Sequence, residues 1–175
     1  MYFSMRVIIV LTLNQNKMKK ILLFVAICAT AFMQQSFAQN ISTPKTSELL
    51  SSYYNIKDAL VSGDATNAAT NAEIFVKTIN SISSEIIHES YKEALLEDAS
   101  TISSTKDLKK QREAFSTFSA NMFALAKEVK LNAGPVYYVY CSMKKATWLS
   151  SSKTIKNPYF GNAMLTCGKV TETIE

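Results

Sequence analysis

The feature that most constrains the fold is the stretch 42–131, in which apolar side chains recur at helical spacing. Pro44 and Gly63 are the only proline and glycine in this stretch, so residues that interrupt helices are almost absent from it. Steps of three or four residues place apolar side chains on one face of a helix. Four such stripes predict four helices: Leu49, Tyr53, Ile56 and Leu60; Ala68, Ala72, Phe75, Ile79 and Ile82; Ile87, Tyr91, Leu95, Ala99 and Ile102; Phe115, Phe118, Met122, Leu125 and Val129.

Residues that begin and end helices separate these stripes. Thr43 before Pro44 suits a helix start, and Gly63 before Asp64 suits a helix end followed by a new start. Serines, the segment 105–107 and finally Gly134 mark the later boundaries. Four helices with short connections pack most simply as an antiparallel, up-and-down bundle. The predicted fold class is therefore mainly α, and we expect its aromatic and methionine side chains, including Phe115, Phe118, Met122 and Phe123, to form the core.

After Pro135 the pattern changes from helical to strand-like. Residues 136–141 are aromatic or β-branched up to the cysteine, which favours a strand, and residues 165–170 are a candidate for its short partner. Between them lie Trp148 and a turn-forming stretch, 157–161. The sequence therefore predicts a short C-terminal β-like segment, 136–172, which contains cysteines and methionines and follows the bundle in one domain, 39–175.

The N-terminal residues are typical of export. Met18 is followed by two lysines, residues 21–32 form an apolar run of about 12 residues, and Ser36-Phe37-Ala38 is a small-x-small cleavage site. We expect residues 1–38 to be a signal peptide, with translation starting at Met18. The apolar run is shorter than the roughly 20 residues that span a bilayer. A single long uncleaved anchor is the alternative, and the polar break at 14–20 disfavours it.

Removal of the signal peptide changes the charge balance. The whole chain has a formal net charge of +5, but four of its 19 Lys and Arg residues and none of its 14 Asp and Glu residues precede Gln39. The mature chain is left with a net charge of +1, which gives no reason to expect nucleic acid as a partner. We expect a periplasmic protein without stable membrane insertion after cleavage.

Two sulfur motifs hold the distinctive chemistry of the mature chain. Cys141 is followed by Met143, and Met164 is followed by Cys167. Thiolates and thioethers are the ligands of soft ions such as Cu(I) or Ag(I), whereas Zn(II) more often takes cysteine with histidine. On a strand, residues i and i+2 point to the same face, so Cys141 and Met143 are expected to project together. The four residues form a candidate metal site.

The same cysteines equally suit a disulfide. Pairs of cysteines in small exported domains commonly form one. A Cys141–Cys167 bond closes a loop of about 25 residues, worth on the order of 3–4 kcal/mol in the chain-entropy model. Met143 and Met164 would then be packing residues. The residues alone leave both alternatives open, and the two states can interconvert, with the oxidised pair as a resting form.

An enzyme is not expected. The chain has one histidine, His88, which lies on the third predicted helix, far in sequence from either cysteine. A catalytic triad needs a base within hydrogen-bonding reach of its nucleophile. There is also no glycine-rich phosphate loop and no Cys-x-x-Cys pair.

The C-terminal motifs resemble an uncharacterised bacterial domain family of unknown function. The resemblance spans most of residues 45–172 and includes an Arg112-x-x-Phe115 step. The family pattern is Cys-Pro-Met, Trp-Leu, Asn-Pro-Tyr-x-Gly and Met-x-x-Cys-Gly; the corresponding residues here are Cys141-Ser142-Met143, Trp148-Leu149, Asn157-Pro158-Tyr159-Phe160-Gly161 and Met164-Leu165-Thr166-Cys167-Gly168. Ser142 departs from the family's proline, which fixes the backbone between the two ligands.

Members of that family occur alone behind a signal peptide, and also attached to periplasmic adaptor subunits of heavy-metal (copper/silver) efflux pumps. The resemblance therefore implies a non-enzymatic binding module for copper(I) or silver(I) in envelope metal handling, with an efflux adaptor or another envelope protein as its partner. The alternative is a structural or protein-interaction domain that is stabilised by a Cys141–Cys167 disulfide and binds no metal.

Overall fold

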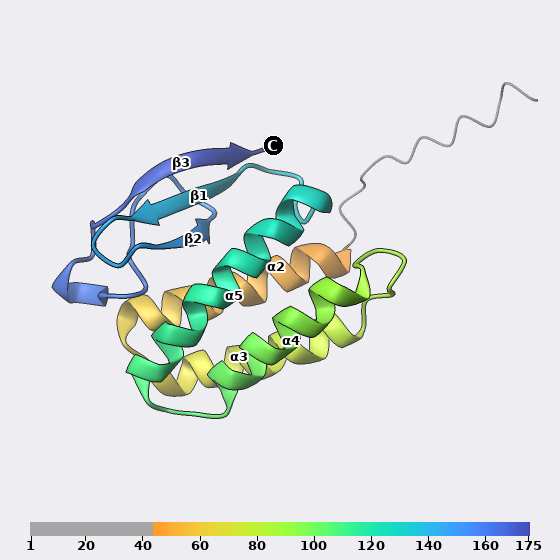
Figure 1. Cartoon of the computed structure of the whole chain (residues 1–175), viewed down its shortest axis with the longest axis horizontal. Coiled ribbons are helices and arrows are strands. Elements are labelled where there is room, and N and C mark those ends of the chain that lie inside the picture. The colour runs from red at the N-terminus through yellow and green to blue at the C-terminus, as the bar shows by residue number, and fades with distance from the viewer. Residues whose placement is uncertain (1–43) are drawn as a thin grey trace, which may run out of the picture. The chain divides into compact units, whose positions relative to one another are not determined.

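The computed structural model describes residues 44–175, and its four helices agree with the four apolar stripes. They are α2 (Pro44–Ser62), α3 (Ala65–Asn80), α4 (Glu89–Ser103) and α5 (Leu108–Glu128) (Figure 1). The predicted signal peptide, the start at Met18 and the expected cap at Thr43 lie outside the described residues. None of the helices described is both long enough and apolar enough to cross a membrane.

Short polar side chains set the helix boundaries. Asp64 accepts a hydrogen bond from the Asn67 N–H at 2.9 Å and begins α3, while Asp107 accepts one from the Lys109 N–H at 2.9 Å and begins α5. Such caps satisfy amide groups that have no partner inside the helix. The third helix starts two residues later than its stripe suggested. His88 is its N-cap rather than a residue within it.

Each helix packs against the next along the chain, as expected for an up-and-down bundle (Figure 1). The predicted core is confirmed: Tyr53, Phe75, Phe115 and Phe118 have no exposed surface. The Phe75 and Phe118 rings meet edge to face with centroids 4.8 Å apart. Burial of a large apolar side chain is worth about 1.5–3 kcal/mol, so these rings contribute much of the bundle's stability. Phe123 differs, because it is only partly buried and stacks on Tyr138 of the sheet.

The C-terminal segment is a three-stranded antiparallel sheet with strand order β2-β1-β3. Strand β1 (Val136–Cys141) lies as predicted. Strand β2 (Ala146–Ser150) lies between the two predicted strands, where no strand was predicted. Strand β3 (Lys169–Ile174) shares only its first two residues with the predicted partner at 165–170. Residues 164–167 instead form a turn, which the hydrogen bond from the Cys167 N–H to the Met164 carbonyl closes at 3.0 Å.

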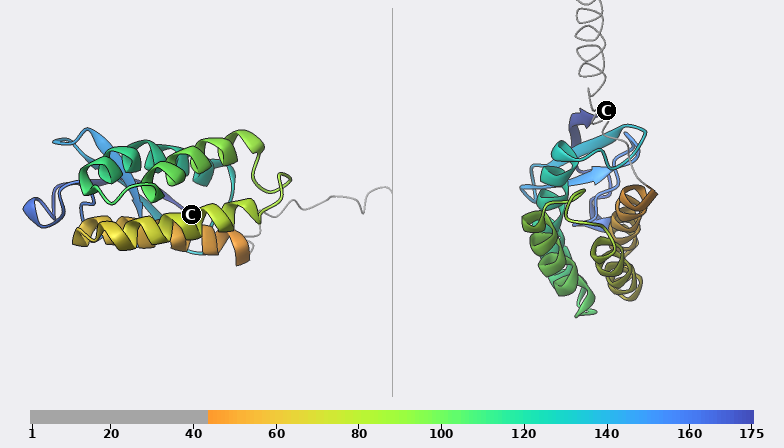
Figure 2. Two further views of the ribbon diagram at one scale, coloured as in Figure 1. Left: turned by 90° about the horizontal axis from the view of Figure 1, so that it is seen from below. Right: turned by 90° about the vertical axis from the view of Figure 1, so that its right-hand side faces the viewer.

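The sheet lies along one side of the bundle, next to α5, and a 3₁₀ turn, η1 (Gly161–Ala163), rests on α2 (Figure 2). One hydroxyl joins the two layers. Tyr53 of α2 shares a 2.7 Å hydrogen bond with Ser119 of α5 and accepts one from the Leu149 N–H of β2 at 3.0 Å. Burial raises the pKa of Tyr53 well above its ordinary value, so its hydroxyl stays protonated. This contact fixes the strands on the helices.

Candidate functional site: a buried thiol beside an exposed one

The two cysteines of the described chain meet at one end of the sheet. Cys141 is the last residue of β1 and has no exposed surface, while Cys167 lies in the turn before β3 and is partly exposed. Their sulfur atoms are 2.7 Å apart, and both cysteines are free thiols in this structure. A disulfide bond is about 2.05 Å long, so the sulfurs lie roughly 0.65 Å beyond bonding distance. The fold therefore brings together residues that are 26 positions apart in sequence.

A tight turn surrounds the Cys141 sulfur with hydrogen-bond donors. Strand β1 ends at Cys141, which pairs with Ala146 of β2, and the four residues between them form the turn. Lys145 closes this turn with a φ of 55°, in the left-handed region. The backbone N–H groups of Met143 and Lys144 donate to the Cys141 sulfur. The turn thus creates a small concentration of positive dipoles at the thiol.

Asn157 organises the opposite wall of the site. Its side chain is completely buried, and its Oδ1 accepts hydrogen bonds from the N–H groups of Tyr159 at 2.8 Å and Phe160 at 3.2 Å. This is the local turn that asparagine favours before a proline. Its Nδ2 donates to the Cys167 carbonyl at 2.6 Å and also bonds to the Cys141 sulfur. One side chain therefore contacts both cysteines.

The backbone of Asn157 completes this role. Its N–H donates to the Leu165 carbonyl at 2.8 Å, and its carbonyl accepts from the Gly161 N–H at 3.0 Å. We predicted Asn157 only as a turn residue and missed that it holds the thiols in place. Its position just before Pro158 predicted a turn, but no sequence signal indicated which groups the side chain would reach.

Two glycines allow this loop to lie close to the rest of the domain. A Cβ on Gly161 would lie 2.7 Å from Arg112 Nη2 and 2.8 Å from the Val61 carbonyl oxygen. A Cβ on Gly168 would lie 2.7 Å from Trp148 Cη2. The Arg112 guanidinium itself donates to the Leu60 carbonyl at 2.8 Å. Any larger residue at either glycine would push the loop away from its support.

The surroundings of the two thiols affect their pKa values in opposite directions. Burial raises the pKa of Cys141, but hydrogen bonds from the Cys167 thiol, from the turn N–H groups and from Asn157 outweigh it and leave the pKa below its ordinary value. The pKa of Cys167 is raised, chiefly because its hydrogen bond to Cys141 favours the protonated form. The pair therefore ionises first at Cys141 and shares the remaining proton.

The two predicted thioether ligands, Met143 and Met164, lie in the turns next to the two cysteines. Met143 lies in the turn after β1 rather than on the strand, so the alternation that we expected to align it with Cys141 does not apply. Met143 is 66% exposed, and Met164 is 38% exposed. Within residues 44–175, no group of three or more histidine, cysteine, aspartate or glutamate side chains is placed to hold a metal ion. The single histidine, His88, is an exposed helix cap.

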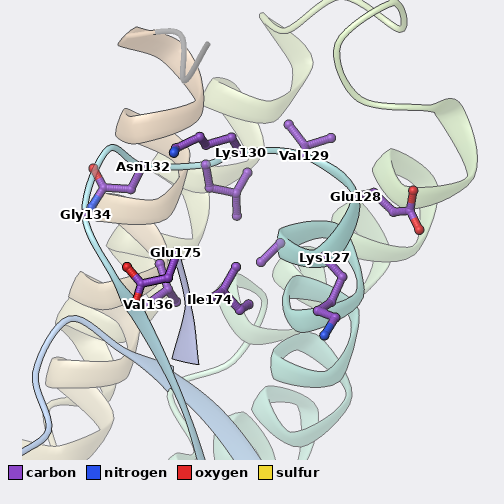
Figure 3. A pocket seen from close by; sticks show the side chains of 11 residues that line it. Lys127, Glu128, Val129, Lys130, Asn132, Gly134, Val136, Ile174 and Glu175 are labelled. Carbon is purple, nitrogen blue, oxygen red and sulfur yellow. The ribbon is translucent and has the colours of Figure 1, made fainter. Parts of the chain in front are cut away.

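A pocket at the other end of the sheet offers different chemistry. It has a volume of about 260 Å³ and lies where β1 begins and β3 ends, beside the C-terminus of α5 (Figure 3). Its walls include Lys127, Lys130, Glu128 and Glu175 around the apolar Ile174. Mixed charges of this kind do not match the preferences of a soft ion. The thiol pair is therefore the stronger candidate site.

Comparison with known proteins gives one match. No curated protein and no solved structure matches the chain. Residues 49–134, just short of half of the chain, match the model of a family described as a protein of unknown function (DUF3347). The matched region runs from α2 to the residues before β1 and does not include Cys141 or Cys167. Over its helices, this chain is thus similar to a domain family of unknown function.

Proposed function

We propose that this protein is an exported, non-enzymatic module that binds soft metal ions, copper(I) or silver(I), in the periplasm through Cys141 and Cys167. The observation that carries the proposal is the meeting of these two sulfurs, 2.7 Å apart, at the edge of the domain. Met143 and Met164 lie in the neighbouring turns, and both residues are exposed. Two thiolates with nearby thioethers are the ligand set that favours a soft ion.

Metal binding requires a modest rearrangement of the site. Metal–sulfur bonds are about 2.3 Å long for zinc, and two bonds of similar length span up to about 4.6 Å across the ion. The sulfurs must therefore separate from their present 2.7 Å. Cys167 is the residue that can move, because it is partly exposed while Cys141 is enclosed.

The partner is proposed from the family resemblance. A module of this kind would deliver its ion to, or receive it from, a heavy-metal efflux adaptor or another envelope protein. Envelope location follows from the predicted signal peptide, residues 1–38. Loss of the Cys141 and Cys167 protons on binding would make the affinity rise with pH.

A Cu(I) titration tests the metal proposal. The reduced full chain, held anaerobically, is titrated with Cu(I) against a chromophoric chelator, and the variants are Cys141→Ser, Cys167→Ser and Met143→Leu. We expect one ion per chain, loss of binding in either serine variant and weaker binding in Met143→Leu. Met122→Leu is the control, because this buried core methionine lies outside the site. Equal Cu(I) uptake by the wild type and Cys141→Ser would reject the proposal.

The second candidate is a structural or protein-interaction domain with a Cys141–Cys167 disulfide and no metal. The specific observation in its favour is that the sulfurs lie only about 0.65 Å beyond the length of a disulfide bond. Thiol counting distinguishes the two candidates. Protein isolated without reductant from the periplasm would contain no reactive thiol at either position if the disulfide is permanent, whereas the metal module yields both thiols once its ion is removed.

A further inference from the structure

The two thiols differ in accessibility, and this difference defines an order of reaction. We propose that Cys141 and Cys167 form a reversible dithiol–disulfide couple, in which Cys167 exchanges with small anionic disulfides and Cys141 resolves the product. This inference goes beyond metal binding and does not depend on it. It names a reaction, a substrate class and the role of each sulfur.

Cys167 is the sulfur that an external molecule can reach. It lies in the turn between η1 and β3 and is partly exposed, whereas Cys141 has no exposed surface. Thiol–disulfide exchange requires the attacking sulfur to approach the disulfide along its axis, so access limits the rate. Gly168, the next residue, adds no side chain that could cover the sulfur.

Cys141 is placed to complete the reaction. Its sulfur lies 2.7 Å from that of Cys167, and it is held there by the N–H groups of Met143 and Lys144. A reacting group held at such a distance has a large advantage in effective concentration over a second molecule from solution. A mixed disulfide on Cys167 would therefore be short-lived as long as Cys141 is present.

The chemistry balances in two steps. The Cys167 thiol passes its proton to the neighbouring Cys141 thiolate as its sulfur attacks one sulfur of a small disulfide RSSR; the S–S bond breaks, the mixed disulfide forms, and the released RS⁻ takes up this proton from Cys141. The Cys141 thiolate then attacks the Cys167 sulfur, which forms the protein disulfide and releases the second RS⁻. The protein loses two electrons, the small disulfide gains them, and the two thiol protons pass to the two released thiolates. Excess small thiol reverses both steps.

The charge around the pair selects the substrate. Residues 136–171 contain no aspartate or glutamate, and three lysines adjoin the two cysteines along the chain: Lys144, Lys145 and Lys169. Two of these follow Cys141 in its turn, and Lys169 starts the strand that follows Cys167. Glu172, the next acid along the chain, is paired with Lys127. Such a field attracts anionic disulfides and falls off over about 10 Å at 0.1 M salt.

The order of reaction is tested by trapping the intermediate. The sequence has a third cysteine, Cys28, within the predicted signal peptide, and Cys28→Ala is present in every variant so that it does not react. The reduced full chain is mixed anaerobically with glutathione disulfide and followed by mass spectrometry. We expect the wild type to form its internal disulfide without a lasting adduct. Cys141→Ser should accumulate one glutathione on Cys167. Cys167→Ser should react slower by a factor of about ten or more, because its remaining sulfur is enclosed. Equal adduct rates in the two serine variants, or a wild-type adduct that persists, would overturn the proposed order.

The substrate class has its own test. Rates for the wild type are compared between glutathione disulfide, which is anionic, neutral hydroxyethyl disulfide and cationic cystamine. The anionic reagent should react fastest at low salt, and the three rates should converge as salt rises. The double variant Lys144→Gln/Lys145→Gln should slow only the anionic reagent, while Lys109→Gln/Lys110→Gln at the start of α5 should not. Rates independent of reagent charge would overturn the substrate class. None of these readouts involves metal, so they stand or fall separately from the Cu(I) titration.

Discussion

The substitution Asn157→Ala is the most informative single perturbation of the thiol site. It removes three side-chain hydrogen bonds within the loop: one to the Cys167 carbonyl at 2.6 Å, and two from the N–H groups of Tyr159 at 2.8 Å and Phe160 at 3.2 Å. Asn157 has no exposed surface, so water does not replace its side chain without cost. Each lost bond is worth about 1 kcal/mol, and a buried group left without a partner costs about 1–3 kcal/mol.

Together these terms predict a loss of about 3 kcal/mol in the free energy of unfolding. In the variant, water would reach the partly buried Cys167 carbonyl more easily than the buried Tyr159 N–H and would replace part of its lost hydrogen bond. The loss of stability should therefore be smaller than the sum of the penalties for three groups left without a partner. Asn162→Ala is the matched control, because this asparagine lies in the same loop and is exposed. Its replacement should change stability by less than about 0.5 kcal/mol.

Urea unfolding under reducing conditions measures both variants. The chain has one tryptophan, Trp148, which is 1% exposed and adjoins the loop through Gly168. Its fluorescence therefore reports the environment of the site directly. If Asn157→Ala is no less stable than Asn162→Ala, the assignment of Asn157 as the residue that holds the thiol loop is wrong.

Two further substitutions test how the site is supported. Gly168→Ala places a Cβ 2.7 Å from Trp148 Cη2 and should destabilise the domain by about 1–3 kcal/mol. Gly134→Ala is the control and should have little effect, because the nearest neighbour of its Cβ would be 3.7 Å away. Thermal unfolding of the two variants measures the difference. Tyr53→Phe leaves the buried Leu149 N–H without its acceptor and should cost about 1–3 kcal/mol, which urea unfolding would detect. A neutral result for Tyr53→Phe would mean that the sheet does not depend on this hydroxyl.

The helices could be predicted from the sequence because their signals are local. Apolar steps of three and four residues identify the buried face of each helix, and Gly63, Asp64 and Asp107 mark boundaries through hydrogen bonds to neighbouring residues. The third stripe was slightly misleading. Ile87 is fully buried although it precedes α4, because a residue next to a helix can pack into the same core.

The sheet was less predictable because its pairing is not local. Strand β2 has five residues, follows two lysines and alternates poorly, since Trp148, Leu149 and Ser150 are all buried. It is defined by its pairing with β1 and by its contact with α5. Strand β3 is exposed or partly buried along its length, so it lacks the apolar pattern by which strands are recognised. Tertiary contacts, rather than intrinsic preference, determine both strands.

The sequence predicted the two thiols of the candidate site but not the residue that holds them in place. Cys141 and Cys167 were recognisable by residue type, and the structure places them together. Strand alternation does not apply to Met143, because β1 ends at Cys141 and Met143 lies in the turn that follows. Asn157 was overlooked as part of the site because its contacts reach across ten residues to Cys167, a relation that spacing in the sequence does not reveal.

The helices and the thiol segment depend on one another, although the family match covers only the helices. Arg112 of α5 ties down the end of α2 through the Leu60 carbonyl and lies directly beneath Gly161. Phe115, one turn further along α5, packs against Tyr159 with ring centroids 5.9 Å apart. The Arg-x-x-Phe step in the matched region therefore supports the loop that holds Cys167.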